Sequence, residues 1–201
     1  MTTDISTMAG QNYQQMAKLK LHIQALIAST MMERMLPNYL LFSQLTQFGE
    51  GKALRDALNI VWEKQHVKQL KLSTEKQLEK IEPNIPNIED FDQFGVYPAL
   101  DTAMALTCLL QGMGGDESGF VDVCKLSQAS VGKLVELELS EQHDSLTDEQ
   151  IHQHELMQYE VEFLAELIAD ASKLHQVNKS TVNRYKQRAL ADGITNIAIE
   201  V

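Results

Sequence analysis

The chain has 201 residues and a net charge of −11, with 44% hydrophobic and 22% charged residues. This length suits one domain with a sizeable core, and the composition is that of a globular protein, not a disordered one. The excess of carboxylates disfavours binding to nucleic acid and to anionic membrane surfaces. The longest charge-free apolar run, residues 102 to 115, is shorter than the about 20 residues that a membrane-spanning helix needs. The composition therefore predicts no nucleic-acid partner and no membrane partner.

The N-terminal sequence and the cysteines bear on the compartment. Met1 is not followed by the basic region and apolar stretch that are typical of a signal peptide. The two cysteines, Cys108 and Cys124, lie in apolar surroundings typical of reduced core residues. These features predict a cytoplasmic location.

Helical spacing dominates the first part of the chain. Residues 1 to 9 are small and polar, and we expect them to be disordered or frayed, with a single helical domain over residues 10 to 201. Apolar residues then recur three or four positions apart over residues 13 to 36, which predicts a helix with room for a break along its length. Proline has no backbone N–H, so Pro37 predicts the end of this helix, and Asn38 is suited to cap a short helix after it.

Two more helices are expected before the middle of the chain. The turn at residues 48 to 51 precedes a segment with apolar residues at helical spacing. Thr74 and Gln77 form a capping-box pattern that opens a short helix ending near Pro83. Residues 84 to 93 are acidic and irregular in pattern, and form the longest connection.

The stretch around residues 98 to 112 predicts a buried central helix. Pro98 suits the first turn, where its missing N–H has no intrahelical partner, and glycines follow the last turn. Apolar residues cover most of the helix circumference, as in helices that are buried on all sides. A single charged residue, Asp101, lies within this run. This helix is the element around which we expect the other helices to pack.

The second half of the chain is also helical in pattern. We expect a helix over residues 120 to 139, a polar linker over residues 140 to 146, and a long helix over residues 147 to 174 that opens with a capping box. A final helix over residues 179 to 191 precedes a tail that alternates weakly. The predicted fold class is all-α, a single-domain multi-helix bundle of about seven to nine helices.

Asp101 is the most informative candidate residue. A carboxylate on a buried helix requires a proton, a cation or hydrogen bonds, because an unpaired buried charge is costly. Arg34 and Arg55 lie on helices that must pack nearby, and an arginine offers a carboxylate two parallel hydrogen bonds. With Tyr97 one turn earlier, these residues form either a structural polar cluster or a pocket for a small molecule. We expect Asp101 to be buried and held by one of the two arginines.

Other catalytic and metal patterns are missing. Carboxylate-bridged di-metal bundles use two Glu-x-x-His pairs that project inward from facing helices. The two pairs in this sequence, Glu63 with His66 and Glu149 with His152, stand among polar residues typical of solvated faces. Ser127 and Ser130 have no histidine nearby in the sequence, and residues 48 to 51 lack the lysine and third glycine of nucleotide-binding loops. We therefore expect no metal and no cofactor.

Residues 168 to 188 resemble a helix-turn-helix in part. Residues 177 to 184, followed by Lys186 and Arg188, have the character of a recognition helix. The preceding helix is longer than the motif requires, and His175 stands where an apolar residue is usual. Since the chain is acidic overall, a surface helix with a basic outer side is the better interpretation.

Four sequence blocks carry a resemblance to a known family. They are Glu33 to Tyr39, Phe48 to Gly51, Arg55 with Trp62-Glu63, and Phe94 to Asp101. Together, in this order and spacing, they resemble the YjaG-like family of bacterial proteins, also called domain of unknown function 416. The resemblance runs from about residue 20 to the C-terminus and is weak over residues 140 to 190. It implies a bacterial, cytoplasmic, all-helical protein, and it supplies no catalytic residues.

Three functions remain open at this point. The leading hypothesis is a non-enzymatic helical protein that acts through protein–protein contacts, either with itself as a homo-oligomer or with another protein. The first alternative is a small-molecule binder or enzyme with a pocket near Asp101. The second is a DNA-binding regulator that uses residues 168 to 188.

Overall fold

The structure, a computed structural model, describes residues 4–140 and 146–201. Within these residues the fold is all-α and contains no strand, apart from one isolated antiparallel bridge between Ile194 and Glu200. The α-helices, in chain order, are α1 (Ile5–Ala17), α2 (Leu21–Thr46), α3 (Gly51–Lys64), α4 (Thr74–Ile81), α5 (Val96–Gly114), α6 (Gly119–Ser140), α7 (Asp148–Gln153), α8 (Glu155–Ala171) and α9 (Lys179–Arg188). Two 3₁₀ turns, η1 (Glu82–Asn84) and η2 (Ile88–Asp90), connect α4 to α5. The predicted all-α single-domain fold is confirmed.

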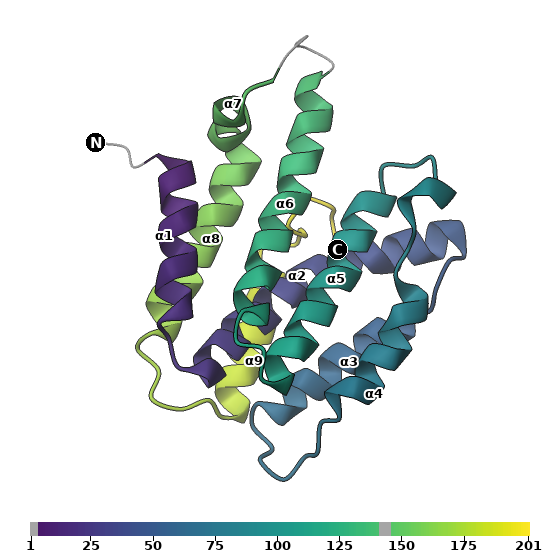
Figure 1. The fold of residues 1–201 in the computed structure, drawn as a ribbon. Coiled ribbons are helices and arrows are strands. Elements are labelled where there is room, and N and C mark those ends of the chain that lie inside the picture. Colours follow the sequence, from purple (N-terminus) through teal and green to yellow (C-terminus); the bar gives the residue numbers. More distant parts are fainter. Residues whose placement is uncertain (1–3, 141–145) are drawn as a thin grey trace.

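Helices α2 and α5 form the centre of the molecule. Every residue from Ile23 to Leu36 of α2 is buried, because apolar residues stand on all sides of this part of the helix. Helix α5 packs against α2, α4 and α6, and Figure 1 shows it between α6 and α4 with α2 crossing behind. The buried central helix predicted near residues 98 to 112 is thus α5, and it shares the centre with α2.

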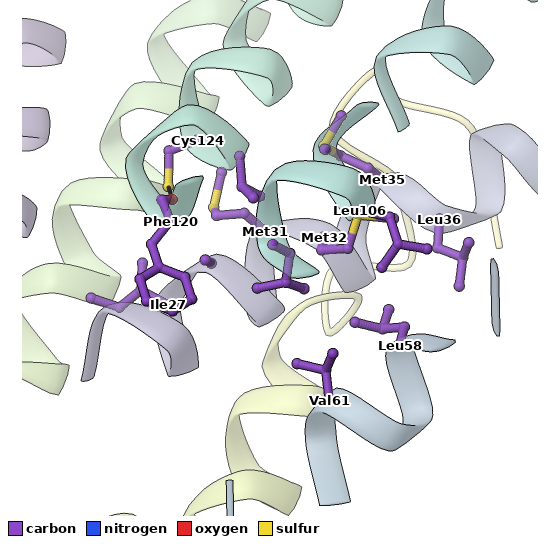
Figure 2. Packing of buried hydrophobic residues seen from close by; sticks show 14 of the residues in the cluster. Ile27, Met31, Met32, Met35, Leu36, Leu58, Val61, Leu106, Phe120 and Cys124 are labelled. Atoms are coloured by element: carbon purple, nitrogen blue, oxygen red, sulfur yellow. Dashed lines mark hydrogen bonds between the residues drawn. The ribbon is translucent and has the colours of Figure 1, made fainter. Parts of the chain in front are cut away.

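The main core lies where α2, α3, α5 and α6 meet. Figure 2 shows Met31, Met32 and Met35 of α2 in one cluster with Leu106 of α5 and Leu58 of α3. Methionine fills irregular gaps between helices because its side chain is unbranched and flexible. A second, smaller cluster joins α1, α6, α8 and the C-terminal tail. Each cluster buries the apolar stripe that the sequence places on its helices.

The N-terminal prediction requires a correction. Helix α1 begins at Ile5, with the Asp4 carboxylate accepting a hydrogen bond from the backbone N–H of Thr7 at 3.3 Å. The frayed segment expected over residues 1 to 9 is therefore wrong for residues 5 to 9, and residues 1–3 lie outside the described part. The helix expected over residues 13 to 36 is divided at residues 18 to 20.

Pro37 does not end a helix, contrary to the prediction. It lies inside α2, which continues to Thr46. Proline within a helix removes one backbone hydrogen bond and costs about 3 kcal/mol. The residues around it, Leu36, Asn38 and Tyr39, are buried on the same continuous helix. Burial of these side chains outweighs the local cost of the proline, so packing determines the helix end here.

The long helix expected over residues 147 to 174 is two helices. Its capping box is present, with Thr147 and Gln150 bonding each other's backbone N–H groups, but it opens only the short helix α7. The chain then turns at His154, whose backbone is extended and whose side chain accepts from the N–H of Leu156 to cap α8. Of the linker expected over residues 140 to 146, Ser140 belongs to α6, and residues 141–145 lie outside the described residues. In the part of the chain that the structure describes, no helix has the length and apolar character needed to cross a membrane.

Candidate functional site

Asp101 is buried as expected, but its partner is a lysine. Its side chain is 6% exposed, and both carboxylate oxygens accept hydrogen bonds from the Lys133 amine, at 2.8 and 2.9 Å. The Ser130 hydroxyl donates to the same carboxylate at 2.9 Å. Ser130 and Lys133 lie one turn apart on α6, which packs alongside α5. The prediction that Arg34 or Arg55 holds Asp101 is wrong.

Arg34 forms a different cluster, with residues of α8 and of the C-terminal segment. Its side chain is 0% exposed, and its Nε donates to the buried carboxylate of Glu160 at 3.1 Å. Its Nη1 donates to Asp192 at 2.9 Å and to the backbone carbonyls of Ala189 and Ile194, each at 3.1 Å. Arg34 therefore ties α2 to α8 and to the segment that follows α9.

Aromatic rings cover the rest of the Arg34 guanidinium. Its central carbon lies 4.8 Å from the centroid of the Phe163 ring and 5.3 Å from that of Tyr159. Its Nη2 has no hydrogen-bond partner among the described residues, so these rings provide its favourable contacts through cation–π attraction. The Ser127 hydroxyl donates to the second oxygen of Glu160. Arg34, Glu160 and Ser127 have no exposed surface, whereas Tyr159 and Asp192 reach the surface. The buried part of the cluster has the character of a structural tie.

The two carboxylates around Arg34 have opposite pKa shifts. Burial raises the pKa of Glu160, against the lowering effects of Arg34 and Ser127. Partial burial also acts to raise the pKa of Asp192, but the hydrogen bond from Tyr159 and the charge of Arg34 outweigh it, and the pKa is lowered. A carboxyl with a lowered folded-state pKa stabilises the fold above its ordinary pKa, and this contribution disappears as the pH falls through the lowered value.

We therefore expect Asp192→Asn to reduce the loss of stability on acidification. Below about pH 4 the unfolded chain binds a proton at Asp192 that the folded chain resists, so wild-type stability decreases there. Urea unfolding midpoints measured from about pH 6 to about pH 3 should fall less steeply in the variant than in the wild type. Glu79→Gln, which changes an exposed carboxylate on α4, is the control. An unchanged pH slope in Asp192→Asn would contradict the assignment.

Arg55 belongs to a third cluster. Its Nη1 donates to Glu33 at 2.6 Å, and the indole N–H of Trp62 donates to the other oxygen of Glu33 at 2.8 Å. Glu33 lies on α2, while Arg55 and Trp62 lie two turns apart on α3. The four predicted site residues are therefore separated: Arg34 and Arg55 each hold a carboxylate of their own, and only Tyr97 remains near Asp101.

Tyr97 belongs to an exposed surface, which we call the α5/α6 outer face, and the buried Asp101 contacts this surface through Lys133. The face consists of Tyr97, Leu100 and Met104 on α5 and Lys133 and Leu137 on α6. Tyr97, Met104 and Leu137 are 39%, 38% and 44% exposed. Residues at this spacing on α5 share one side of the helix. The Lys133 amine lies 6.0 Å from the centroid of the Tyr97 ring, which joins the two helices' parts of the face.

A cavity of about 560 Å³ lies at one end of this face. Phe94, Tyr97 and Leu137 line it together with Ile151 of α7. The Phe94 and Tyr97 rings lie 5.8 Å apart between centroids. Its charged lining residues are Lys133, Glu136 and Asp148. Apolar and aromatic side chains with a few polar groups are typical of ligand and peptide pockets.

The helix-turn-helix interpretation loses support from the geometry. Residues 172 to 178 separate α8 from α9, whereas the motif joins its helices by three or four residues. Arg188, one of its basic residues, donates to Glu166 at 2.9 Å and to Asp170 at 2.5 Å. A charge that is already paired with carboxylates contributes less to binding phosphate.

Neither the two cysteines nor the residue types that bind metals form a candidate site in the described residues. Cys108 and Cys124 form no disulfide, and burial raises the pKa of both thiols, which disfavours the reactive thiolate. Over residues 4–140 and 146–201, no three His, Cys, Asp or Glu side chains gather as metal ligands would.

Lys133 is the site residue that sequence reasoning missed. Arginine was preferred for its paired hydrogen bonds, but helix rotation determines which cation reaches a buried carboxylate. A signal was present: Ser130 and Lys133 are three positions apart on the helix that follows the central helix directly. Consecutive helices usually pack together, so the polar positions of this helix were the nearest candidates.

The chain is similar to several known proteins. A family model described as Protein of unknown function (DUF416) matches residues 11–200. The Uncharacterized protein YjaG of Escherichia coli is 30% identical over 167 residues, which cover 83% of this chain and 85% of that protein. An Uncharacterized protein of Haemophilus influenzae is 32% identical over 169 residues, with 84% and 86% covered.

A solved structure supports the same assignment. The crystal structure of a DUF416 family protein from Shewanella baltica matches with a TM-score of 0.85 and 30% identity, covering 94% of this chain and 98% of that one. The resemblance predicted from the four sequence blocks is confirmed, and the chain belongs to the DUF416 family of bacterial proteins.

Proposed function

We propose that this protein is non-enzymatic and acts by binding another protein through the α5/α6 outer face. The observation that carries the proposal is the exposure of Tyr97, Met104 and Leu137 on one surface of a chain with a net charge of −11. The centres of protein interfaces are poor in charge and rich in tyrosine and methionine. Contiguous exposed apolar surface of this kind marks interaction sites in monomeric proteins.

The charge of Lys133 does not oppose this role. Its amine is held by the buried Asp101 carboxylate, so the pair is neutral and is already hydrogen-bonded before a partner arrives. A paired charge at the edge of an interface adds little to the cost of removing water from the face. Asp101 is thus a positioning residue that fixes the Lys133 side chain against Tyr97.

We place this activity in the cytoplasm, where the two unpaired cysteines would remain reduced. Both a homo-oligomer and a complex with a different protein are compatible with the outer face. A small-molecule pocket near Asp101 is the second candidate, and the cavity of about 560 Å³ beside Tyr97 favours it.

Photo-crosslinking in living bacteria tests the proposal. We expect a photo-reactive benzoylphenylalanine in place of Met104 to give discrete covalent adducts with a protein when the cells are irradiated. The same amino acid in place of Glu79, which is exposed on α4, is the control and should give none. Mass spectrometry of the adduct distinguishes a second copy of the chain from another protein. Failure to obtain protein adducts from positions 97, 104 and 137 would overturn the proposal.

A further inference from the structure

The cavity beside Tyr97 shares a wall with a second cavity along α6. The second cavity, of about 670 Å³, lies between α1, α6 and α7. The two cavities share Lys133, Glu136, Asp148 and Ile151 in their walls. We call the two cavities together the groove; with lining residues from α1, α5, α6 and α7 it has more room than one small molecule requires. Its size suits a segment of polypeptide, such as a helix laid along a groove.

The charges on this groove are acidic. Of its charged residues, Lys133 is paired with Asp101, and Lys125 is paired with Asp122. Glu136 and Asp148 form no ion pair with the described residues. The groove therefore combines apolar side chains with two carboxylates that have no cation partner in the part of the chain that the structure describes. A partner that brings positive charge would gain from both features.

The two carboxylates of the groove favour a basic segment of another protein over a second copy of this chain. A second copy of the chain that docked through the same face would bring its own Glu136 and Asp148 to the groove, and any second copy would add its net charge of −11. Repulsion between like charges across an interface weakens association and slows encounter. A basic segment would instead strengthen the association and speed the encounter.

We propose that the groove binds a basic amphipathic helix of another protein. Its apolar side chains would enter the cavity lined by Phe94, Tyr97, Leu137 and Ile151, and its lysine or arginine side chains would pair with Glu136 and Asp148. This inference rests on the proposed function, because it names the partner chemistry for the same surface. It does not depend on which protein carries the segment.

Binding of two synthetic peptides to the full chain tests the inference. One is an amphipathic helical peptide of lysine and leucine, and the other has glutamate in place of each lysine. Fluorescence anisotropy of labelled peptide should show that the lysine peptide binds at least about tenfold more tightly. Added sodium chloride should weaken its binding, because salt screens exposed charges.

Matched variants locate the binding. Glu136→Lys should weaken binding of the lysine peptide about fivefold, and Leu137→Ser about tenfold. Glu79→Lys changes the net charge by the same amount as Glu136→Lys, but on α4, and should change binding less than about twofold. Equal effects of the two charge reversals would show non-specific attraction and overturn the inference.

The failures of the two proposals are distinguishable. Equal affinity for both peptides, or adducts from position 104 that contain only a second copy of the chain, overturns the basic-partner inference and leaves protein binding intact. An outer face that yields no protein adduct overturns the proposed function itself. Adducts with a basic segment of a different protein support both.

Discussion

Arg34→Met is expected to destabilise the protein by about 4 kcal/mol, because a buried carboxylate would lose its cation. Arg34 is the largest side chain with no exposed surface, and it bonds Glu160, Asp192 and two backbone carbonyls. Methionine keeps much of the volume and the contact with the Phe163 ring. The loss would therefore report the charge and hydrogen bonds more than the packing. Urea unfolding at neutral pH measures the change.

Two control variants test whether the loss of stability comes from the buried Arg34 cluster or from the removal of any positive charge. Lys52→Met removes a side chain that is 83% exposed and should leave the unfolding midpoint unchanged. Adding Glu160→Gln to Arg34→Met should recover part of the loss, because a neutral amide is less costly to bury than an unpaired carboxylate. An Arg34→Met midpoint equal to that of Lys52→Met would show that the buried cluster contributes nothing to stability.

The same variant should loosen the C-terminal segment first. Arg34 donates to the backbone carbonyls of Ala189 and Ile194, which lie on either side of Asp192. Thr195 and Asn196 follow and have no exposed surface. Hydrogen exchange at the Thr195 amide, which bonds the carbonyl of Ile199 at 2.9 Å, should be faster in Arg34→Met than in the wild type. Arg34 thus connects a residue early in the chain to the packing of its end.

Much of the fold could be predicted from apolar spacing, and the errors share one cause. The helices at residues 51 to 64 and 96 to 114 lie where the pattern predicts them. The predicted break at Pro37 is absent, because burial of the side chains around it overrides a local cost. The long helix predicted over residues 147 to 174 is interrupted at His154, where one residue with an extended backbone changes the direction of the chain. Local signals give a helix's existence, and packing decides its ends.

The candidate site could be predicted only in part. The burial of Asp101 follows from its apolar neighbours, which the sequence shows. The identity of its partner depends on how α5 and α6 are rotated against each other. The sequence points to the polar positions of α6, but its spacing does not distinguish Lys133 from Lys125. The separation of Arg34 from Asp101 likewise depends on which side of α2 faces α8. Side-chain pairs between helices require the assembled fold.

Gly119 is the second position at which a substitution should strongly lower stability, because it lies against the backbone of α5 and so determines how closely α5 and α6 pack. A Cβ atom on Gly119 would lie 2.3 Å from the carbonyl oxygen of Cys108 and 2.9 Å from the backbone nitrogen of Gly112. Both neighbours are backbone atoms of α5, so no side-chain rotation relieves the clash. We expect Gly119→Ala to destabilise the protein by about 3 kcal/mol, through forced separation of the two helices.

Replacing a glycine with alanine at another position should stabilise the protein instead. A Cβ atom on Gly10, inside α1, meets nothing within 4 Å. Gly10→Ala should therefore stabilise the protein by about 0.5–1 kcal/mol, because alanine loses less backbone entropy in a helix. Urea midpoints of Gly119→Ala and Gly10→Ala, measured side by side, test both predictions.

Separation of α5 from α6 in Gly119→Ala would also move Lys133 away from Asp101 and Tyr97. Gly119→Ala should then weaken lysine-peptide binding as well, and a variant with wild-type midpoint and binding would show that this close contact does not position the outer face.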